Sequence, residues 1–67
     1  MITLSINGAT RQFPAALSVA ELIATLGYTG KRIALERNGE IVPRGLFATQ
    51  QLFDGDKLEV VVAVGGG

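Results

Sequence analysis

The stretch Lys57-Leu58-Glu59-Val60-Val61-Val62-Ala63-Val64 is rich in β-branched residues and predicts a β-strand from about Lys57 to Val64. Successive side chains of a strand point to opposite faces, so Leu58, Val60, Val62 and Val64 share one face. Glu59, Val61 and Ala63 share the other face. A strand with one fully apolar face belongs in a sheet that covers a core, and the rest of the chain must supply the other strands.

Only Gly65-Gly66-Gly67 follows this strand. Glycine has no Cβ, so such a segment fits a narrow slot, and fully extended it reaches about 10 Å. We therefore predict a folded domain over residues 1–64 and a flexible reactive tail over 65–67, whose terminal carboxylate another enzyme can activate. The alternative is that these glycines are simply a frayed chain end. The lack of a polar spacer after Val64 favours the reactive tail.

The outer face of this strand permits two interpretations. A sheet with one solvated face normally carries polar residues there, yet Val61 and Ala63 are apolar. Central strands favour β-branched residues in any case, which is a purely structural explanation. The functional alternative is an apolar docking patch beside the tail for an activating enzyme.

The N-terminal residues predict a hairpin. Ile2 to Ile6 alternates apolar and polar residues, as a half-buried strand does. Asn7-Gly8 is a strong hairpin signal because both turn positions accept a positive φ. The return strand is expected over Ala9–Phe13, and Pro14 ends it.

One short amphipathic helix is expected next. Ser18 and Glu21 have the spacing of a capping box, which marks a helix start. Gly27 supplies the left-handed residue that ends the helix. One apolar face is formed at helical spacing by Val19, Leu22, Ile23 and Leu26.

Two further strands should precede the last one. Ile33–Arg37 reads as a strand, Asn38-Gly39 as a turn, and residues 40–42 as a short strand that Pro43 ends. Residues 44–51 are expected to form a short helical turn and a loop. The predicted fold is an α+β roll of the β-grasp (ubiquitin-like) type. It has a mixed sheet of four to five strands, one helix on one face, and the first and last strands parallel at the centre.

Composition narrows the function. Six basic and six acidic residues cancel, and the four aromatic residues are scattered, so we expect no nucleic-acid partner. The chain has neither His nor Cys, which argues against a zinc site, disulfides and independent catalysis. No basic-then-apolar leader pattern is visible, and no apolar run approaches the roughly 20 residues that span a bilayer. We expect a cytoplasmic protein without a membrane partner.

With these motifs in place, the chain resembles the ThiS family, the small sulfur carriers of thiazole (thiamine) biosynthesis. The resemblance covers the whole chain and includes an aromatic residue, Phe47, where family members commonly carry Trp. The more specific motif is Ile41-Val42-Pro43-Arg44, whereas Asp54-Gly55-Asp56 and the Gly-Gly end also occur in the related molybdopterin carriers. The matching segments are Asn38 to Arg44, Asp54-Gly55-Asp56 and Val64-Gly65-Gly66-Gly67.

The resemblance implies a function for the tail. A ThiF-like (E1-like) adenylating enzyme, using ATP and Mg, would adenylate the carboxylate of Gly67. Sulfur from a persulfide donor, such as a cysteine desulfurase, would then give a thiocarboxylate, which a ThiG-like thiazole synthase would use. Gly66 would be the essential neighbour, and Gly65 would extend the arm. The chain itself would be a co-substrate rather than an enzyme, would bind no cofactor, and would be a monomer when free.

Other interpretations stay open at this point. The chain could carry sulfur in another pathway, such as molybdopterin synthesis, or act as a ubiquitin-like interaction module or protein modifier. Pro43 reads as a strand terminator. Arg44 is either a solvated charge or a partner contact, and the sequence does not decide between them.

Overall fold

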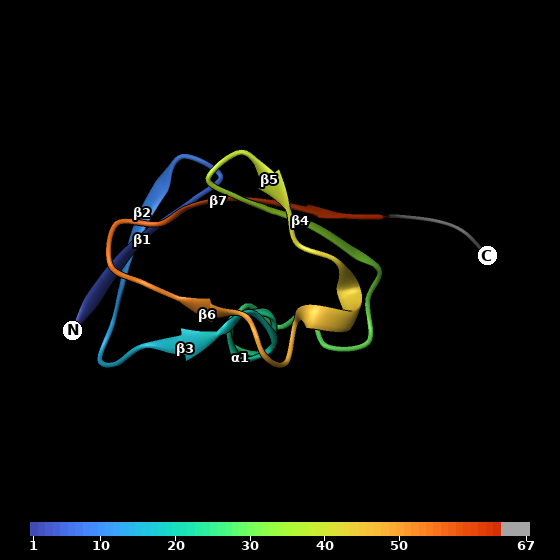
Figure 1. The fold of residues 1–67 in the computed structure, drawn as a ribbon, viewed down its shortest axis with the longest axis horizontal. Helices are drawn as coiled ribbons and strands as arrows, with labels where there is room; N and C mark the ends of the chain where they lie inside the picture. Colours follow the sequence, from blue (N-terminus) through green and yellow to red (C-terminus); the bar gives the residue numbers. More distant parts are fainter. Residues whose placement is uncertain (64–67) are drawn as a thin grey trace.

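The fold consists of two layers, a large sheet above and a helix with a small second sheet below (Figure 1). The computed structural model describes residues 1–63. The strands and helices of these residues are β1 (Ile2–Ile6), β2 (Ala9–Phe13), β3 (Leu17–Ser18), α1 (Val19–Thr25), β4 (Ile33–Arg37), β5 (Glu40–Ile41), the 3-10 helix η1 (Arg44–Leu46), β6 (Gln51–Leu52) and β7 (Lys57–Val62).

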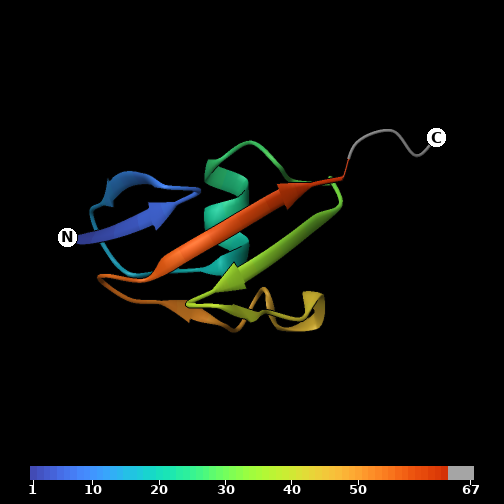
Figure 2. The same cartoon turned by 90° about the horizontal axis from the view of Figure 1, so that it is seen from above.

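The large sheet has five strands in the order β2-β1-β7-β4-β5. The first and last strands, β1 and β7, are parallel neighbours, with Ser5 opposite Lys57 and Ile6 opposite Leu58. The other pairs in this sheet are antiparallel. Figure 2 shows β7 crossing the middle of the sheet with α1 behind it. This arrangement confirms the predicted β-grasp fold.

Both predicted Asn-Gly hairpins are present. Asn7 and Gly8 have φ values of 51° and 83°, and Asn38 and Gly39 have 52° and 87°. Positive φ at both central positions is the geometry whose twist matches that of the flanking strands. These turns set the registers of β1 with β2 and of β4 with β5.

Helix α1 begins and ends where the sequence predicts. The Glu21 amide donates to the Ser18 hydroxyl at 3.1 Å, and the Ser18 amide donates to the Glu21 carboxylate at 2.8 Å. At the other end Gly27 has a φ of 80°. The Tyr28 amide reaches back to the Ile23 carbonyl at 3.0 Å, which closes a Schellman motif. The capping box and the glycine stop are both confirmed.

Three details differ from the sequence-based expectation. Strands β3 and β6 form a small antiparallel sheet, with Leu17 opposite Leu52, that the sequence did not predict. Gln51 therefore belongs to a strand rather than to the expected loop. Strand β7 ends at Val62, short of the expected Val64, which lies outside the described residues. Two-residue strands are too short to show a periodicity, which is why β3 and β6 were missed.

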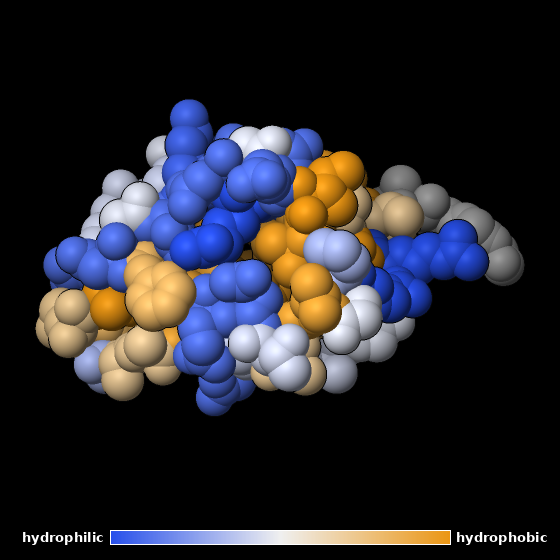
Figure 3. All heavy atoms as spheres, in the orientation of Figure 1, coloured by the Kyte–Doolittle hydropathy of each residue, from blue (hydrophilic) through white to orange (hydrophobic). Residues whose placement is uncertain are grey.

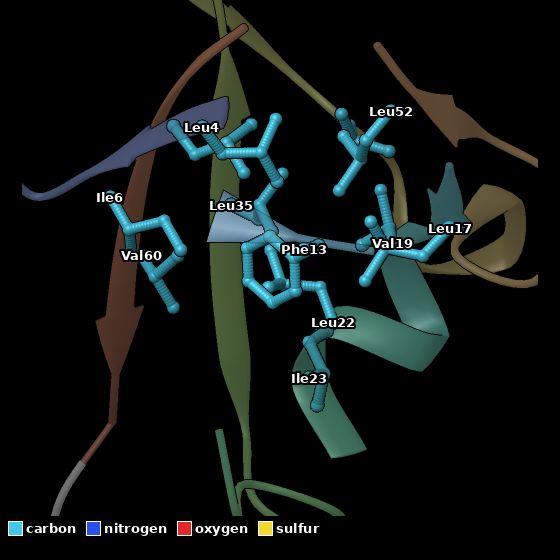
Figure 4. Packing of buried hydrophobic residues seen from close by; sticks show 12 residues of the cluster. Leu4, Ile6, Phe13, Leu17, Val19, Leu22, Ile23, Leu35, Leu52 and Val60 are labelled. Atoms are coloured by element: carbon cyan, nitrogen blue, oxygen red, sulfur yellow. The ribbon is translucent and has the colours of Figure 1, made fainter. Parts of the chain in front are cut away.

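A single hydrophobic core fills the space between the layers. Leu22 of α1 lies against Leu35 of β4 and Phe13 of β2 at its centre (Figure 4). Phe47 and Leu26 are partly buried against the same core. The buried hydrophobic residues are Leu4, Ile6, Phe13, Leu17, Val19, Leu22, Ile23, Leu35, Val42, Leu52, Leu58 and Val60.

Candidate functional site

The residues predicted to be modified or to enter a partner lie outside the described residues. These are Gly67, with Gly65 and Gly66 before it, and the boundary predicted at residue 64 lies there too. Their roles and the two-part division of the chain stay predictions. The structure describes the strand that leads to them and the surface around its end.

Strand β7 is held by hydrogen bonds along both edges. On one side, residues Leu58 to Val62 of β7 pair with the whole length of β4. The Ala63 amide continues this pairing by donating to the Arg32 carbonyl at 3.0 Å. The backbone is thus fixed up to Ala63, the last residue that the structure describes.

On its other edge, β7 continues past the end of β1. The side chain of Asn7 takes over there, donating to the Val60 carbonyl at 2.9 Å and accepting from the Val60 amide at 2.7 Å. A primary amide carries the same donor and acceptor as a peptide group, so it stands in for the next residue of β1. Asn7 therefore has a second role beyond its turn.

The predicted partner-contact residues line one surface region: Val61 and Ala63 lie on the outer face of the sheet, and Arg44 of η1 lines the same hollow. Val61 is 61% exposed, and Ala63 and Arg44 are exposed as well. They line one shallow hollow of about 400 Å³ with Arg32, Ile33 and Ala34. Sequence reasoning missed Arg32 and Ala34, which are brought to Val61 and Ala63 by the pairing of β4 with β7.

Arg44 also lines a second hollow of about 360 Å³, between α1, the loop after it and η1. Ile23, Ile33 and Phe47 contribute apolar surface to this hollow, and Lys31 contributes a second cation. Arg44 thus lies between two hollows on neighbouring faces. Its position is compatible with a partner contact, which stays a prediction.

A further apolar area was not predicted. Figure 3 shows hydrophobic atoms gathered over β5 and the segment that leads to η1. Ile41 and Leu46 are the large exposed hydrophobic residues of this region, at 72% and 48% exposure. The apolar surface is therefore wider than the sequence pattern of β7 indicated.

The Asp54-Gly55-Asp56 motif fixes the start of β7. Asp54 accepts from the Thr3 amide at 2.7 Å, and the Gly55 amide donates to the Thr3 carbonyl at 2.8 Å. Gly55 has a φ of 88°, a conformation that glycine adopts readily. The motif therefore ties the β6–β7 connection to β1, so its role is structural.

The second carboxylate of this motif is buried. The Asp56 carboxylate accepts hydrogen bonds from the Arg37 guanidinium at 2.8 Å, the Asn38 side-chain amide at 3.0 Å and the Phe53 backbone amide at 2.9 Å. Burial acts to raise the pKa of Asp56, but these hydrogen bonds outweigh it and hold the pKa below its ordinary value. The Arg37 guanidinium also lies 5.7 Å from the centroid of the Phe53 ring. The cluster joins β4 to the start of β7.

The described part of the chain offers no metal centre. Residues 1–63 contain no group of three or more His, Cys, Asp or Glu side chains placed to hold a metal ion. None of the helices in these residues is long and apolar enough to cross a membrane.

The five-stranded mixed sheet, the single helix packed on it and the central parallel pair define a ubiquitin-like β-grasp domain. The family model of the ThiS family matches residues 4–67. This chain belongs to the ThiS family.

Solved structures agree with this assignment. The crystal structure of the thiamine biosynthesis protein ThiS from Geobacter metallireducens is 30% identical and has a TM-score of 0.82. The match covers 98% of this chain and 100% of that one. The solution structure of a thiamine biosynthesis protein from the same organism has a TM-score of 0.80 at 32% identity, and covers 98% and 88% of the two chains.

Two kinds of curated relatives match in sequence. A thiazole synthase from Paramagnetospirillum magneticum is 47% identical over 64 residues, which make up 96% of this chain but only 20% of that protein. The chain thus spans a fifth of the length of this relative. The protein ycf40 of Porphyra purpurea, which is uncharacterized, is 36% identical over 66 residues, 98% of this chain and 93% of that protein.

Proposed function

We propose that this chain is a sulfur carrier protein of thiamine biosynthesis that carries sulfur as a thiocarboxylate on Gly67. The observation that supports this proposal is membership of the ThiS family over residues 4–67, a range that includes the three terminal glycines. The structural relatives from Geobacter metallireducens are thiamine biosynthesis proteins, which favours the thiamine pathway over molybdopterin synthesis.

The proposed chemistry begins with activation of the carboxylate. A carboxylate is a poor acyl donor because its leaving group would be oxide. A ThiF-like adenylating enzyme removes this obstacle: a Gly67 carboxylate oxygen attacks the α-phosphorus of ATP, and pyrophosphate leaves. The enzyme supplies the ATP site and the Mg²⁺ that stabilises the charge on the phosphates. The chain supplies only the carboxylate and the surface by which it is recognised.

Sulfur transfer follows on the acyl adenylate. The outer sulfur of a persulfide donor, such as one formed by a cysteine desulfurase, attacks the Gly67 carbonyl carbon, and AMP leaves. A thiol then reduces the sulfur–sulfur bond of the resulting acyl disulfide, which leaves the thiocarboxylate on Gly67 and a disulfide between the thiol and the donor. The chain contains no cysteine, so the terminal carboxyl is the plausible place for covalently carried sulfur.

The folded body contributes a fixed base for this chemistry. Strand β7 is hydrogen-bonded on both edges, and its backbone is held up to Ala63. Three glycines without side chains follow Val64, and they suit entry into a narrow active site. A partner that binds the folded domain therefore finds the Gly67 carboxylate close in the chain to Ala63, whose backbone is held by the sheet.

A ThiG-like thiazole synthase is the proposed acceptor of the sulfur. A thiazole synthase of Paramagnetospirillum magneticum contains a region similar to nearly this whole chain. Joining a carrier domain to the enzyme that consumes its sulfur raises the local concentration of that carrier. This supports a pairing of the present chain with a thiazole synthase. We further propose that the free chain is monomeric and works in the cytoplasm.

Intact mass spectrometry tests the proposal. The chain is incubated with ATP, Mg²⁺, a persulfide source, a thiol and the candidate adenylating enzyme, beside a variant that lacks Gly67. We expect a mass gain that corresponds to replacement of one oxygen by sulfur, localised to the C-terminal peptide and absent from the control. An unmodified chain beside an enzyme proven competent on another carrier would refute the carrier chemistry.

The pathway is tested separately by co-purification. Thiazole synthase should be retained by the immobilised chain, whereas retention of a molybdopterin synthase subunit instead would assign the chain to that pathway. An isopeptide bond between Gly67 and a lysine would identify a protein modifier.

A further inference from the structure

Strand β7 runs beyond its parallel neighbour β1. The pairing of the two strands ends with Ile6 opposite Leu58, whereas β7 continues to Val62. Asn7 is the next residue of the chain, and it leaves β1 for the turn with a φ of 51°. Its backbone amide makes one more bond to β7, to the Leu58 carbonyl at 2.9 Å. Within residues 1–63, the far half of β7 therefore has no neighbouring strand on this edge.

The side chain of Asn7 replaces the missing strand for one step. Its amide group donates to the Val60 carbonyl and accepts from the Val60 amide. In the part of the chain that the structure describes, these are the last hydrogen bonds that hold β7 on the side of β1. Asn7 thus determines how far along β7 both edges are held.

A second turn asparagine holds the start of the same strand. Asn38 has nearly the same conformation as Asn7, with a φ of 52°. The Asn38 side chain accepts from the Lys57 amide at 2.9 Å and donates to the Asp56 carboxylate at 3.0 Å. Each Asn-Gly turn therefore fixes a different part of β7, Asn38 at its start and Asn7 toward its end.

The end of β7 decides where the predicted tail begins. Beyond Val60 this strand is held by its pairing with β4, which the bond from the Ala63 amide to the Arg32 carbonyl extends. Residues 65–67 have no side chain, and glycine restricts the backbone little. Every residue of β7 that left the sheet would have to be ordered again in a partner's active site, at a cost in conformational entropy.

We propose that Asn7 is a positioning residue for the activation of the terminal carboxylate. By holding Val60, it keeps the last residues of β7 in the sheet and fixes the point from which Gly67 is presented to the adenylating enzyme. Asn7 acts through β7 rather than on the reacting atoms. This inference rests on the proposed function and adds a residue, remote from the tail in sequence, that governs the rate of activation.

Asn7→Gly tests the positioning role. The substitution removes the bonds to Val60 and keeps a residue that accepts the turn conformation. Adenylation by the candidate enzyme with ATP and Mg²⁺ is followed by pyrophosphate release. The kcat should fall by about tenfold, because small displacements of a reacting group slow a reaction steeply.

The KM for the carrier distinguishes positioning from loss of folded protein. For Asn7→Gly it should stay within about twofold of wild type, because the surface of the folded domain is otherwise unchanged. Partial unfolding would have the opposite signature. The carrier is the substrate, so a smaller folded fraction would raise the apparent KM and leave kcat unchanged.

Asn38→Gly is the matched control. It makes the same substitution at nearly the same φ, and it removes a hydrogen bond to the start of β7 rather than to its far half. Its kcat should stay within about twofold of wild type, although the variant also loses the bond to Asp56. All variants are assayed below their melting temperatures.

Amide hydrogen exchange tests the strand end without any partner. In Asn7→Gly the Ala63 amide should exchange about tenfold faster relative to the Leu26 amide, because a lost hydrogen-bonded pair favours local opening. The Leu26 amide is bonded to the Leu22 carbonyl in α1 and serves as the reference for opening elsewhere in the fold. In Asn38→Gly the ratio should be that of wild type.

The two measurements separate this inference from the proposed function. Wild type that is never adenylated would refute the proposed function, and the exchange of Ala63 would still decide whether Asn7 fixes the strand end. Unchanged exchange of Ala63 in Asn7→Gly would refute the positioning role, as would an unchanged kcat. An equal loss of kcat in Asn38→Gly would also refute it, by showing that any weakening of β7 slows activation.

Discussion

Asn7 and Val60 form a side-chain-to-backbone pair in which both hydrogen bonds of a strand ladder are reproduced, at 2.9 Å and 2.7 Å. The two residues are separated by 53 positions in the sequence. Asn7 is also in a left-handed conformation, with a φ of 51°. One residue therefore closes a turn and holds the last strand.

The two roles of Asn7 can be separated by substitution. Asn7→Gly keeps the turn and removes the bonds to Val60, so we expect a loss of about 1–3 kcal/mol in the free energy of unfolding. Asn7→Ala should cost more, because alanine tolerates the left-handed conformation less well than either asparagine or glycine. Urea unfolding measures both. Equal stability of wild type and Asn7→Gly would mean that the pair contributes nothing.

The stability of the fold should depend on pH through Asp56. The pKa of Asp56 is lowered in the folded state, so its contribution is fully present above the ordinary value of 3.8 that applies to the unfolded chain. The contribution is lost as the pH falls through the lower folded value, because the folded state then binds the proton too. Unfolding should be followed by urea titration between neutral and strongly acidic pH.

Asp56→Asn is the control for this pH dependence. The variant keeps a hydrogen-bond acceptor but removes the charge that faces Arg37. It should be less stable than wild type at neutral pH, and the difference should shrink as the solution becomes acidic. A difference that stays constant with pH would show that shape rather than charge matters at this position.

Val61→Lys should separate folding from partner recognition. Val61 is 61% exposed on the outer face, so the melting temperature should change by no more than a few degrees. If the apolar patch is a docking site, activation by the proposed adenylating enzyme should nevertheless slow, because a charge replaces apolar contact surface. Thr10→Lys, on the exposed strand β2, adds the same charge elsewhere and should activate normally. An unchanged activation rate for Val61→Lys would show that Val61 is not part of a docking patch for the proposed adenylating enzyme.

Ser18→Ala tests the helix start. The Ser18 hydroxyl accepts from the Glu21 amide, and removing such a cap costs about 1 kcal/mol. For a domain of this size the melting temperature should fall by about 4–8 °C. Ser18→Asp supplies another good cap and should recover most of the loss. A Ser18→Asp variant as unstable as Ser18→Ala would indicate that burial of the hydroxyl, rather than capping, matters.

The elements that could be predicted from sequence are those with strong local signals. Asn-Gly pairs, the Ser18–Glu21 box and Gly27 each act over a few residues, and the structure places each as expected. The β-grasp topology followed from their order. The pairing of Leu17 with Leu52 was missed because two two-residue strands, far apart in sequence, leave no periodic pattern.

The candidate site was predictable from sequence on β7 and at Arg44, but not on β4. The alternation of β7 identified Val61 and Ala63 as outward-facing. The contribution of Arg32 and Ala34 depends on which strand lies beside β7 and in which register, and a single residue of slip would reverse their faces. Such cross-strand relationships belong to the sheet and are not visible in either segment alone.

The parallel pairing of β1 with β7 has a consequence for how the protein is made. Strand β1 is synthesised before the other strands of this domain and acquires its central neighbour only when β7 follows. Until then the β1–β2 hairpin and the β4–β5 hairpin lack the strand that joins them into one sheet. Chains that stop before β7 should therefore remain unfolded and be degraded by cellular proteases. Incomplete chains would then not accumulate as folded proteins that compete with the complete domain for the proposed partner enzymes.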